Sequence, residues 1–179
     1  MSRTTRACVV IGAATLALAA MGAVSPSGAD PVTVTATVLR IVDGDTVDIV
    51  DDVRGRLRVR VLGIDTPETK KPGYTVGCWG PEATDFARAT LLGQRVALIP
   101  DPTQDRTDRY GRTLAYLDRM DGWDYSVEAA RVGAARAYVY NGHPVARADD
   151  IAAAEQEARI AHRGLWGAPC YGDTASVPV

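Results

Sequence analysis

Hydrophobic and polar positions alternate along several short stretches of the chain, and this two-residue period is typical of half-buried β-strands. The pattern is clearest in residues 55–63, where aliphatic side chains occupy one face and arginines the other. Turn-forming aspartate and glycine pairs separate the first three stretches, which we expect to form a meander. The five predicted strands are residues 32–42, 46–50, 55–63, 95–100 and 112–117. Five strands of this length fit a small barrel.

Three further segments carry the start and stop signals of helices. Pro81 lies in the first turn of one helix, Ser126 is predicted to be the N-cap of a second, and Pro144 opens a third. The predicted helices are residues 80–92, 126–133 and 145–162. Proline, glycine and charged residues make 66–79 and 101–111 predicted loops. The expected fold class is therefore α+β, and mainly β.

The first 29 residues have the composition of a secretory signal peptide. Two arginines precede an uncharged run at residues 7–24, and the small residues 27–29 resemble a signal-peptidase site. An uncleaved membrane anchor is the alternative, because 18 residues lie near the lower limit for crossing a bilayer. Both interpretations favour export, so we expect a secreted, extracellular or periplasm-like location, with membrane attachment only if the leader is uncleaved.

The rest of the chain has the length of one globular domain, residues 30–168, followed by a tail at 169–179. The tail has no hydrophobic period, so we expect it to be mobile unless Cys170 holds it. The leader carries two of the chain's 20 basic residues and none of its 22 acidic ones, which leaves a mature net charge of −4. Such a chain cannot bind nucleic acid through its overall charge, and any binding face must be a local basic patch.

Loss of the leader also removes Cys8 and leaves Cys78 and Cys170 as a pair in an oxidising compartment. A disulfide between them would stabilise the fold by up to about 4 to 5 kcal/mol in the chain-entropy treatment. Two free buried thiols are the alternative. The sequence has no Cys-x-x-Cys pair or Cys/His cluster of the kind that binds zinc.

Carboxylates gather at two predicted turns. Asp43 and Asp45 flank the first turn, and Asp65 and Glu68 follow the third strand. Carboxylate oxygens and a backbone carbonyl such as that of Thr66 suit Ca²⁺, and a glutamate free of the ion could position or deprotonate a water. Taken singly, these segments also fit an ordinary hairpin turn and a solvated cap.

Two arginines accompany these acids. Arg60 precedes Asp65 by five residues on the polar face of its strand, and Arg112 follows the tight turn at Tyr110 and Gly111. Either arginine alone would more commonly form a surface salt bridge. Beside paired acids, however, two guanidinium groups are suited to hold a phosphate, and the combination fits cleavage of a phosphodiester.

Five motifs occur in an order that resembles the thermonuclease, or staphylococcal nuclease-like, family. They are Asp-Gly-Asp-Thr-Val, Arg-x4-Asp-Thr-Pro-Glu, Gly-Pro-Glu-Ala, Asp-Arg-Tyr-Gly-Arg-x-Leu-Ala-Tyr and Ala-Tyr-Val-Tyr. The resemblance covers about residues 32–166. It implies a five-stranded OB-fold barrel with three helices, and Ca²⁺-dependent cleavage of DNA and RNA that leaves 3′-phosphates and 5′-hydroxyls. It implies no stable protein partner, and we expect a monomer.

The resemblance also implies a role for each matching residue. The implied Ca²⁺ ligands are Asp45, Asp65 and the carbonyl of Thr66. The implied catalytic residues are Arg60, Glu68 and Arg112. The implied nucleotide-binding residues are Tyr110, Tyr138 and Tyr140, with Asp43 as a further acid behind the ion. The alternative for the tyrosines is that they only cover the core.

Two other functions remain open at this point. The chain could be a non-catalytic OB-fold module that binds nucleic acid or protein, or an extracellular interaction domain in which Ca²⁺ only braces a loop. Loss of catalysis normally removes acids or arginines from such a site, and here all of them are present. The sequence therefore favours the nuclease.

Overall fold

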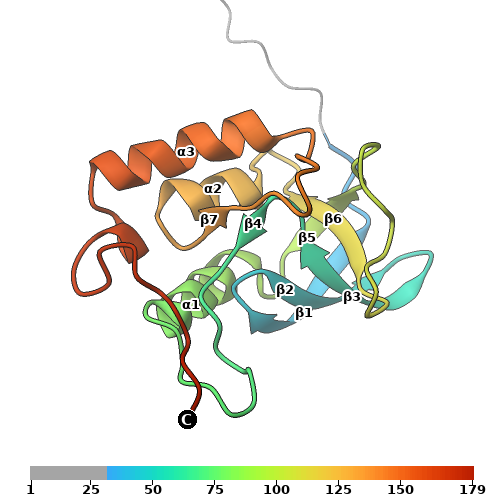
Figure 1. The fold of residues 1–179 in the computed structure, drawn as a ribbon. Helices are drawn as coiled ribbons and strands as arrows, with labels where there is room; N and C mark the ends of the chain where they lie inside the picture. Colours follow the sequence, from blue (N-terminus) through green and yellow to red (C-terminus); the bar gives the residue numbers. More distant parts are fainter. Residues whose placement is uncertain (1–31) are drawn as a thin grey trace, which may run out of the picture.

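A computed structural model describes residues 32–179, and the predicted leader lies outside these described residues. Five strands form a closed barrel in the order β1–β2–β3–β6–β5 (Figure 1). They are β1 (Ala36–Asp43), β2 (Thr46–Asp51), β3 (Gly55–Val61), β5 (Arg95–Ile99) and β6 (Thr113–Asp118). The predicted five-stranded barrel is confirmed, although its first strand begins at Ala36 rather than at residue 32.

The barrel closes because one of its pairings is parallel. β1, β2 and β3 form the predicted antiparallel meander. β3 then pairs in parallel with β6, which places Arg60 beside Leu114. Alternation turns the aliphatic residues of β2 and β3 inward, so that Val47, Ile49 and Val59 are fully buried. The arginines of β3 therefore lie on its outward face.

A second, two-stranded sheet was not predicted. β4 (Ile64–Asp65) pairs with β7 (Arg136–Ala137), two strands too short to show a period in the sequence. The amide of Tyr138 extends this contact by donating to the carbonyl of Gly63 at 2.9 Å. This small sheet joins the segment after β3 to the segment after the second helix.

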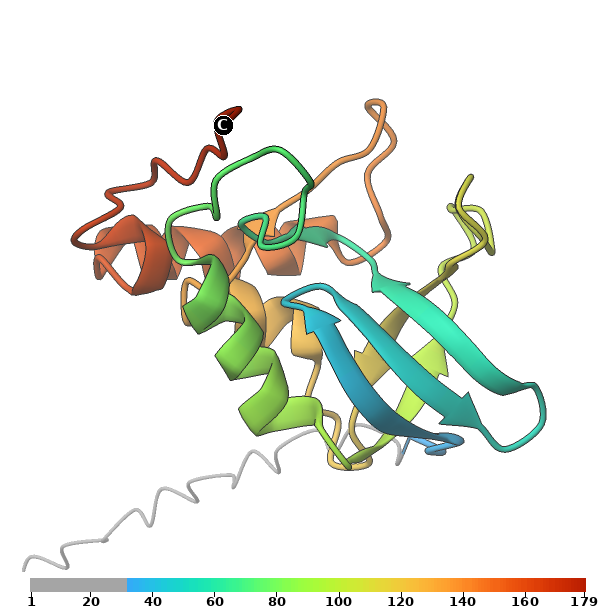
Figure 2. The same cartoon turned by 90° about the horizontal axis from the view of Figure 1, so that it is seen from below.

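The three helices lie together on one side of the barrel (Figures 1 and 2). They are α1 (Gly80–Leu91), α2 (Tyr125–Arg131) and α3 (Ala148–Ile160), and a short 3₁₀ helix, η1 (Gly164–Trp166), follows. All three predicted helices are confirmed. Within residues 32–179, no helix is both long enough and apolar enough to cross a membrane.

The predicted N-cap of α2 was wrong by two residues. Asp124, not Ser126, caps this helix, and its carboxylate accepts the amides of Ser126 at 2.7 Å and Val127 at 3.2 Å. Ser126 lies inside the first turn and is fully buried, where its hydroxyl donates to the carbonyl of Leu62 at 2.8 Å. The serine that resembled a cap therefore fastens α2 to the chain just after β3.

A second contact fastens the same helix to the turn between β1 and β2. Tyr125 is fully buried, and its hydroxyl donates to the carbonyl of Gly44. Gly44 has no room for a side chain, because a Cβ there would lie 2.7 Å from Cγ2 of Thr66. The Tyr125 hydrogen bond thus fastens α2 to the turn that carries Asp43 and Asp45, and the close approach at Gly44 brings that turn against Thr66.

A buried carboxylate organises the loop after β5. Asp101 is 3% exposed and accepts hydrogen bonds from the Tyr116 hydroxyl at 2.6 Å, the Ala146 amide at 2.7 Å and the Thr103 amide at 2.8 Å. Burial alone would raise the pKa of Asp101, but these hydrogen bonds outweigh it and lower the pKa to about 2. Asp101 therefore ties the loop of residues 101–111 to β6 and to the segment before α3.

Replacing Asp101 with asparagine should destabilise the protein at neutral pH but not in acid. A carboxyl with a lowered folded-state pKa stabilises the fold above its ordinary pKa near 4, and this contribution disappears as the pH falls toward 2. We expect Asp101→Asn to lower the free energy of unfolding by about 2 kcal/mol at pH 7. Urea unfolding at several pH values measures the loss, and the exposed Asp105→Asn in the same loop is the control. An equal loss at pH 7 and pH 3 would contradict this account.

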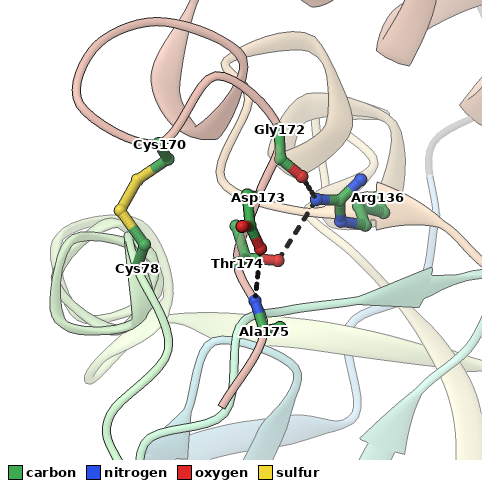
Figure 3. Close-up of a disulfide and its surroundings, with 7 residues drawn as sticks. All are labelled: Cys78, Arg136, Cys170, Gly172, Asp173, Thr174 and Ala175. Atoms are coloured by element: carbon green, nitrogen blue, oxygen red, sulfur yellow. Dashed lines mark hydrogen bonds between the residues drawn. A yellow bond between two sulfur atoms is a disulfide. The ribbon is translucent and has the colours of Figure 1, made fainter. Parts of the chain in front are cut away.

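The C-terminal segment returns to the loop of residues 66–79 and is held there. Cys78 and Cys170 form a disulfide, so the bridged alternative is the one found (Figure 3). Beyond it, the amide of Thr75 donates to the carbonyl of Val177 and the amide of Val179 to the carbonyl of Gly73, both at 2.9 Å. We expected the tail to be mobile unless Cys170 holds it, and Cys170 does hold it through the disulfide.

Arg136 adds a third attachment for this segment. Its Nη2 donates to the carbonyl of Gly172 and, at 3.2 Å, to the hydroxyl of Thr174 (Figure 3). Arg136 belongs to β7 and pairs there with Asp65 of β4. The tail is therefore connected through the small sheet to the segment that carries the predicted acids.

Candidate active site

A cleft of about 400 Å³ opens at the end of β3, beside the loops of residues 101–112 and 138–147. Figure 2 shows both loops projecting beyond the barrel above this end of the strand. The charged and aromatic residues that line the cleft include Arg60, Asp108, Arg109, Arg112, Tyr110, Tyr138 and Tyr140. Its apolar lining includes Val61, Leu62, Leu114 and Val145. Five of the predicted site residues thus meet in one concavity.

Arg60 connects this cleft to the predicted acids. Its side chain is 14% exposed, and Nη1 donates to the carbonyls of Val61 and Ile64, each at 2.9 Å. Nη2 lies 3.2 Å from Oδ2 of Asp45 and 3.1 Å from Oδ1 of Asp65. The two carboxylates, far apart in the sequence, therefore converge on a single positive group.

Asp45 is the most enclosed of the acids, at 6% exposure. Its Oδ2 accepts the amide of Thr66 at 3.0 Å and the hydroxyl of Thr66 at 3.1 Å, and its Oδ1 accepts the hydroxyl of Thr46 at 3.0 Å. These bonds fix the direction of the carboxylate. They also hold Thr66 against Asp45 through its amide and hydroxyl, not through the carbonyl that was predicted to bind the ion.

The acids repel one another. Burial and the charge of Asp45 raise the pKa of Asp43 to about 6, and the same two causes raise the pKa of Asp65 above its usual value. The charge of Arg60 lowers the pKa of Asp65 and offsets this effect only in part. Removing a proton from either group is therefore costly until more positive charge arrives. These acids do not line the cleft itself but lie behind Arg60, and added positive charge would be favoured beside them.

Arg112 is held at one end and free at the other. Its Nε donates to Oδ2 of Asp108 at 2.6 Å, and the side chain is 28% exposed. Among the described residues, its two terminal nitrogens have no hydrogen-bond partner. Arg112 can therefore donate two parallel hydrogen bonds to a phosphate without breaking an existing contact.

Asp108 was not predicted to have a role of its own, although it belongs to one of the five motifs. Its Oδ1 accepts the amides of Tyr110 and Arg112, both at 2.9 Å, while its Oδ2 holds the Arg112 side chain. An aspartate just before a glycine turn commonly accepts amides two to four residues on, and this was the available signal. Asp108 shapes the turn and aims Arg112 at the same time.

The three predicted tyrosines all line the cleft, and all are exposed. Tyr110 is 68% exposed, Tyr138 42% and Tyr140 56%. The guanidinium of Arg109 lies 4.8 Å from the ring of Tyr110, and its Nη2 donates to that tyrosine's hydroxyl at 2.6 Å. Rings this exposed do not cover the core. They are available for stacking on bases.

Glu68 does not line the cleft. It is exposed, and its Oε1 accepts the amide of Lys70 at 2.7 Å. Its charge nevertheless acts on Asp65, whose pKa it raises. The Glu68 carbonyl accepts the amide of Gly77 at 2.7 Å, which anchors the loop near the disulfide. Glu68 therefore borders the acids, but its carboxylate is engaged within its own loop.

The predicted Ca²⁺ ligands fit a hard cation. Residues 32–179 contain no group of three or more acidic, histidine or cysteine side chains close enough to hold an ion by themselves. Ca²⁺ takes six to eight oxygens and accepts carbonyls and water among them, so two convergent carboxylates are a sufficient nucleus. The raised pKa values of Asp43 and Asp65 are the structural sign that added positive charge is favoured here.

Known proteins similar to this chain include nucleases. The family described as Staphylococcal nuclease homologue matches residues 58–168. The chain is 37% identical to the Thermonuclease of Staphylococcus hyicus over 74% of this chain and 75% of that protein. It is 40% identical to the Thermonuclease of Staphylococcus intermedius, over 72% and 74%. An Uncharacterized endonuclease of Escherichia coli is 37% identical, over 72% and 74%.

Proposed function

The chain belongs to the staphylococcal nuclease homologue family and is a nuclease, and on this basis we propose a secreted, Ca²⁺-dependent enzyme that cleaves DNA and RNA. The products of the proposed reaction are 3′-phosphate and 5′-hydroxyl ends. One observation carries the proposal: Arg60 and Arg112 line one cleft, and Arg60 also contacts the paired carboxylates of Asp45 and Asp65.

In the proposed mechanism the two guanidinium groups hold the scissile phosphate. Arg112 offers its two terminal nitrogens, and Asp108 keeps the guanidinium in place through Nε. Phosphoryl transfer places additional negative charge on the non-bridging oxygens, and donors that are already oriented stabilise this charge at little reorganisation cost. The tyrosines of the cleft would stack on the bases next to the scissile bond.

Asp45, Asp65 and the Thr66 carbonyl would hold Ca²⁺, with Asp43 as a further acid behind them. When bound, the ion would supply positive charge beside the same phosphate. Glu68 would release the Lys70 amide, direct a water in line with the leaving 5′ oxygen and accept the water's proton at a carboxylate oxygen. As the bond from phosphorus to the 5′ oxygen breaks, solvent water would supply the proton that completes the 5′-hydroxyl.

One further observation supports export. A disulfide forms and persists in oxidising compartments, so the Cys78–Cys170 bridge agrees with a secreted protein. We also propose that the enzyme acts as a monomer on DNA and RNA.

The experiment that tests this function is digestion with and without the ion. Purified protein should cut single-stranded DNA and RNA in Ca²⁺, stop in chelator, and recover when Ca²⁺ is restored. Glu68→Gln should fold normally and lose most of the Ca²⁺-dependent turnover, and Glu82→Gln, on the exposed start of α1, is the matched control. Equal cleavage in chelator, or products with 5′-phosphates, would contradict the proposal.

A further inference from the structure

A second hollow lies on the outer face of β3, next to the cleft. Its volume is about 490 Å³. It is lined by Asp48, Ile49, Arg56, Leu57, Arg58, Tyr110, Gly111 and Arg112. Three of these side chains are guanidinium groups and one is a carboxylate, so the lining has a net charge of +2, whereas the whole chain is −2. We call the hollow formed by Arg56, Arg58 and Arg112 the arginine groove.

The guanidinium groups of the groove are available to a ligand. Arg56 is exposed, and its side chain has no hydrogen-bond or ion-pair partner within residues 32–179. Arg58 contacts Asp48 through Nε at 2.7 Å and Nη2 at 3.2 Å, which leaves its Nη1 unused among the described residues. Arg40 shares Asp48 through its own Nε at 2.8 Å. The single carboxylate of Asp48 is thus paired with two arginines and does not neutralise the positive charge on this face of β3.

The groove is continuous with the candidate active site. Arg112 and Tyr110 line both hollows. Arg56 and Arg58 also share one face of β3 with Arg60, because side chains on a strand repeat every second residue. Successive arginines on this face are about 6.6 Å apart. That spacing is comparable to the distance between phosphates in an extended single strand, and the last arginine of the row is the active-site Arg60.

We propose that the arginine groove is a subsite that holds the backbone phosphates of single-stranded DNA or RNA beyond the scissile bond. This inference rests on the proposed nuclease function. The exposed tyrosines of the cleft favour unpaired bases, and a strand that leaves the cleft past Arg112 enters the groove directly. The subsite gives an acidic chain the local basic patch that a polyanionic substrate requires.

The test compares long and short substrates on matched variants. Arg56→Gln/Arg58→Gln removes two charges from the groove, and Asp48 keeps Arg40 as a partner. Arg88→Gln/Arg163→Gln removes two exposed charges from the helical side and is the control. Binding of labelled single-stranded DNA of about 12 nucleotides, a length that one OB-fold covers, is measured in chelator by fluorescence anisotropy. A trinucleotide serves as the short substrate.

We expect the groove variant to bind the long strand about five- to tenfold more weakly than wild type and to bind the trinucleotide unchanged. The slope of log affinity against log salt should fall by about 0.7 for each phosphate that the variant no longer neutralises. The control should match wild type on both strands. If the double variant does not fold, the single Arg56→Gln replaces it, because that side chain has no hydrogen-bond or ion-pair partner within the described part of the chain.

Two outcomes overturn the subsite. One is equal affinity of wild type and groove variant for the long strand, and the other is an equal reduction in affinity for the long strand and the trinucleotide. Cleavage assays of the same proteins in Ca²⁺ report on the nuclease separately. A wild type that binds through the groove but cuts nothing would refute the proposed function and leave the subsite standing.

Discussion

Replacing Arg112 with glutamine is expected to lower kcat on a trinucleotide, which is too short to depend on the arginine groove, by about 10²–10³-fold with little change in KM. The reason lies in the two ends of this side chain. Asp108 fixes Nε at 2.6 Å, and the terminal nitrogens line the cleft without a partner among the described residues. Their strongest contact would be made in the transition state, when the phosphate carries most charge. Glutamine keeps an amide donor, but it lacks the positive charge of the guanidinium and its two terminal nitrogens that can donate parallel hydrogen bonds.

The control for this prediction is Arg106→Gln. Arg106 is exposed in the same loop but is absent from the lining of both hollows. Its replacement removes the same charge and should leave kcat and KM unchanged. Steady-state kinetics on the trinucleotide in Ca²⁺ measures both variants, after equal melting temperatures have shown that both fold. If Arg112→Gln raised KM and left kcat unchanged, Arg112 would only bind substrate.

Removing the disulfide should produce the largest loss of stability. Cys78 and Cys170 are 92 positions apart, and a cross-link over this length restricts the unfolded chain strongly. We expect Cys78→Ala/Cys170→Ala to lower the free energy of unfolding by about 4 to 5 kcal/mol. The native state should also become less ordered locally, because the tail pairs with the loop of residues 66–79 beside the bridge. Denaturant unfolding measures the first effect, and limited proteolysis of the tail the second.

Reductant supplies the control for this second prediction. Dithiothreitol should destabilise the wild type to the level of the double variant and leave the double variant unaffected. The same treatment should also lower activity, since Glu68 lies in the loop that the tail covers. Equal unfolding midpoints of the oxidised wild type and the double variant would show that the tail is held by its hydrogen bonds alone.

Local signals were sufficient to predict the five barrel strands and the three helices, but not the short strands β4 and β7. The outward arginines of β3 and the inward Val59 and Val61 follow from a period of two residues, and the turns at Gly44 and Gly111 follow from turn chemistry. Local signals failed where the decisive contact came from another segment. Ser126 looked like an N-cap, but Asp124 lies at the position where the chain enters the helix, and the serine hydroxyl bonds to Leu62.

In the candidate site, too, local signals predicted some features and contacts between distant segments decided the others. The residue types and motifs predicted Arg60, Arg112, Asp45 and Asp65 as chemical groups, but no local pattern states that they meet. Arg60 lines one cleft with Arg112 because β3 pairs in parallel with β6, and it contacts both acids, which Thr66 helps to position by bonding back to Asp45. Only the assembled structure shows that Glu68 is engaged with Lys70 and that Arg112 lines two hollows rather than one.

The order of amino acids was enough to specify the kind of protein: a small barrel with three helices, the chemical groups of a nuclease, and a pair of cysteines able to bridge. These properties depend on side-chain alternation, turn preferences and short motifs, all of which act over a few residues. The folded chain was needed to establish which groups face one another, how burial and the charge of Asp45 raise the pKa values of Asp43 and Asp65, and where the tail is fastened. Most of those properties depend on distances between residues far apart in the chain, and such distances are set only when the chain has folded.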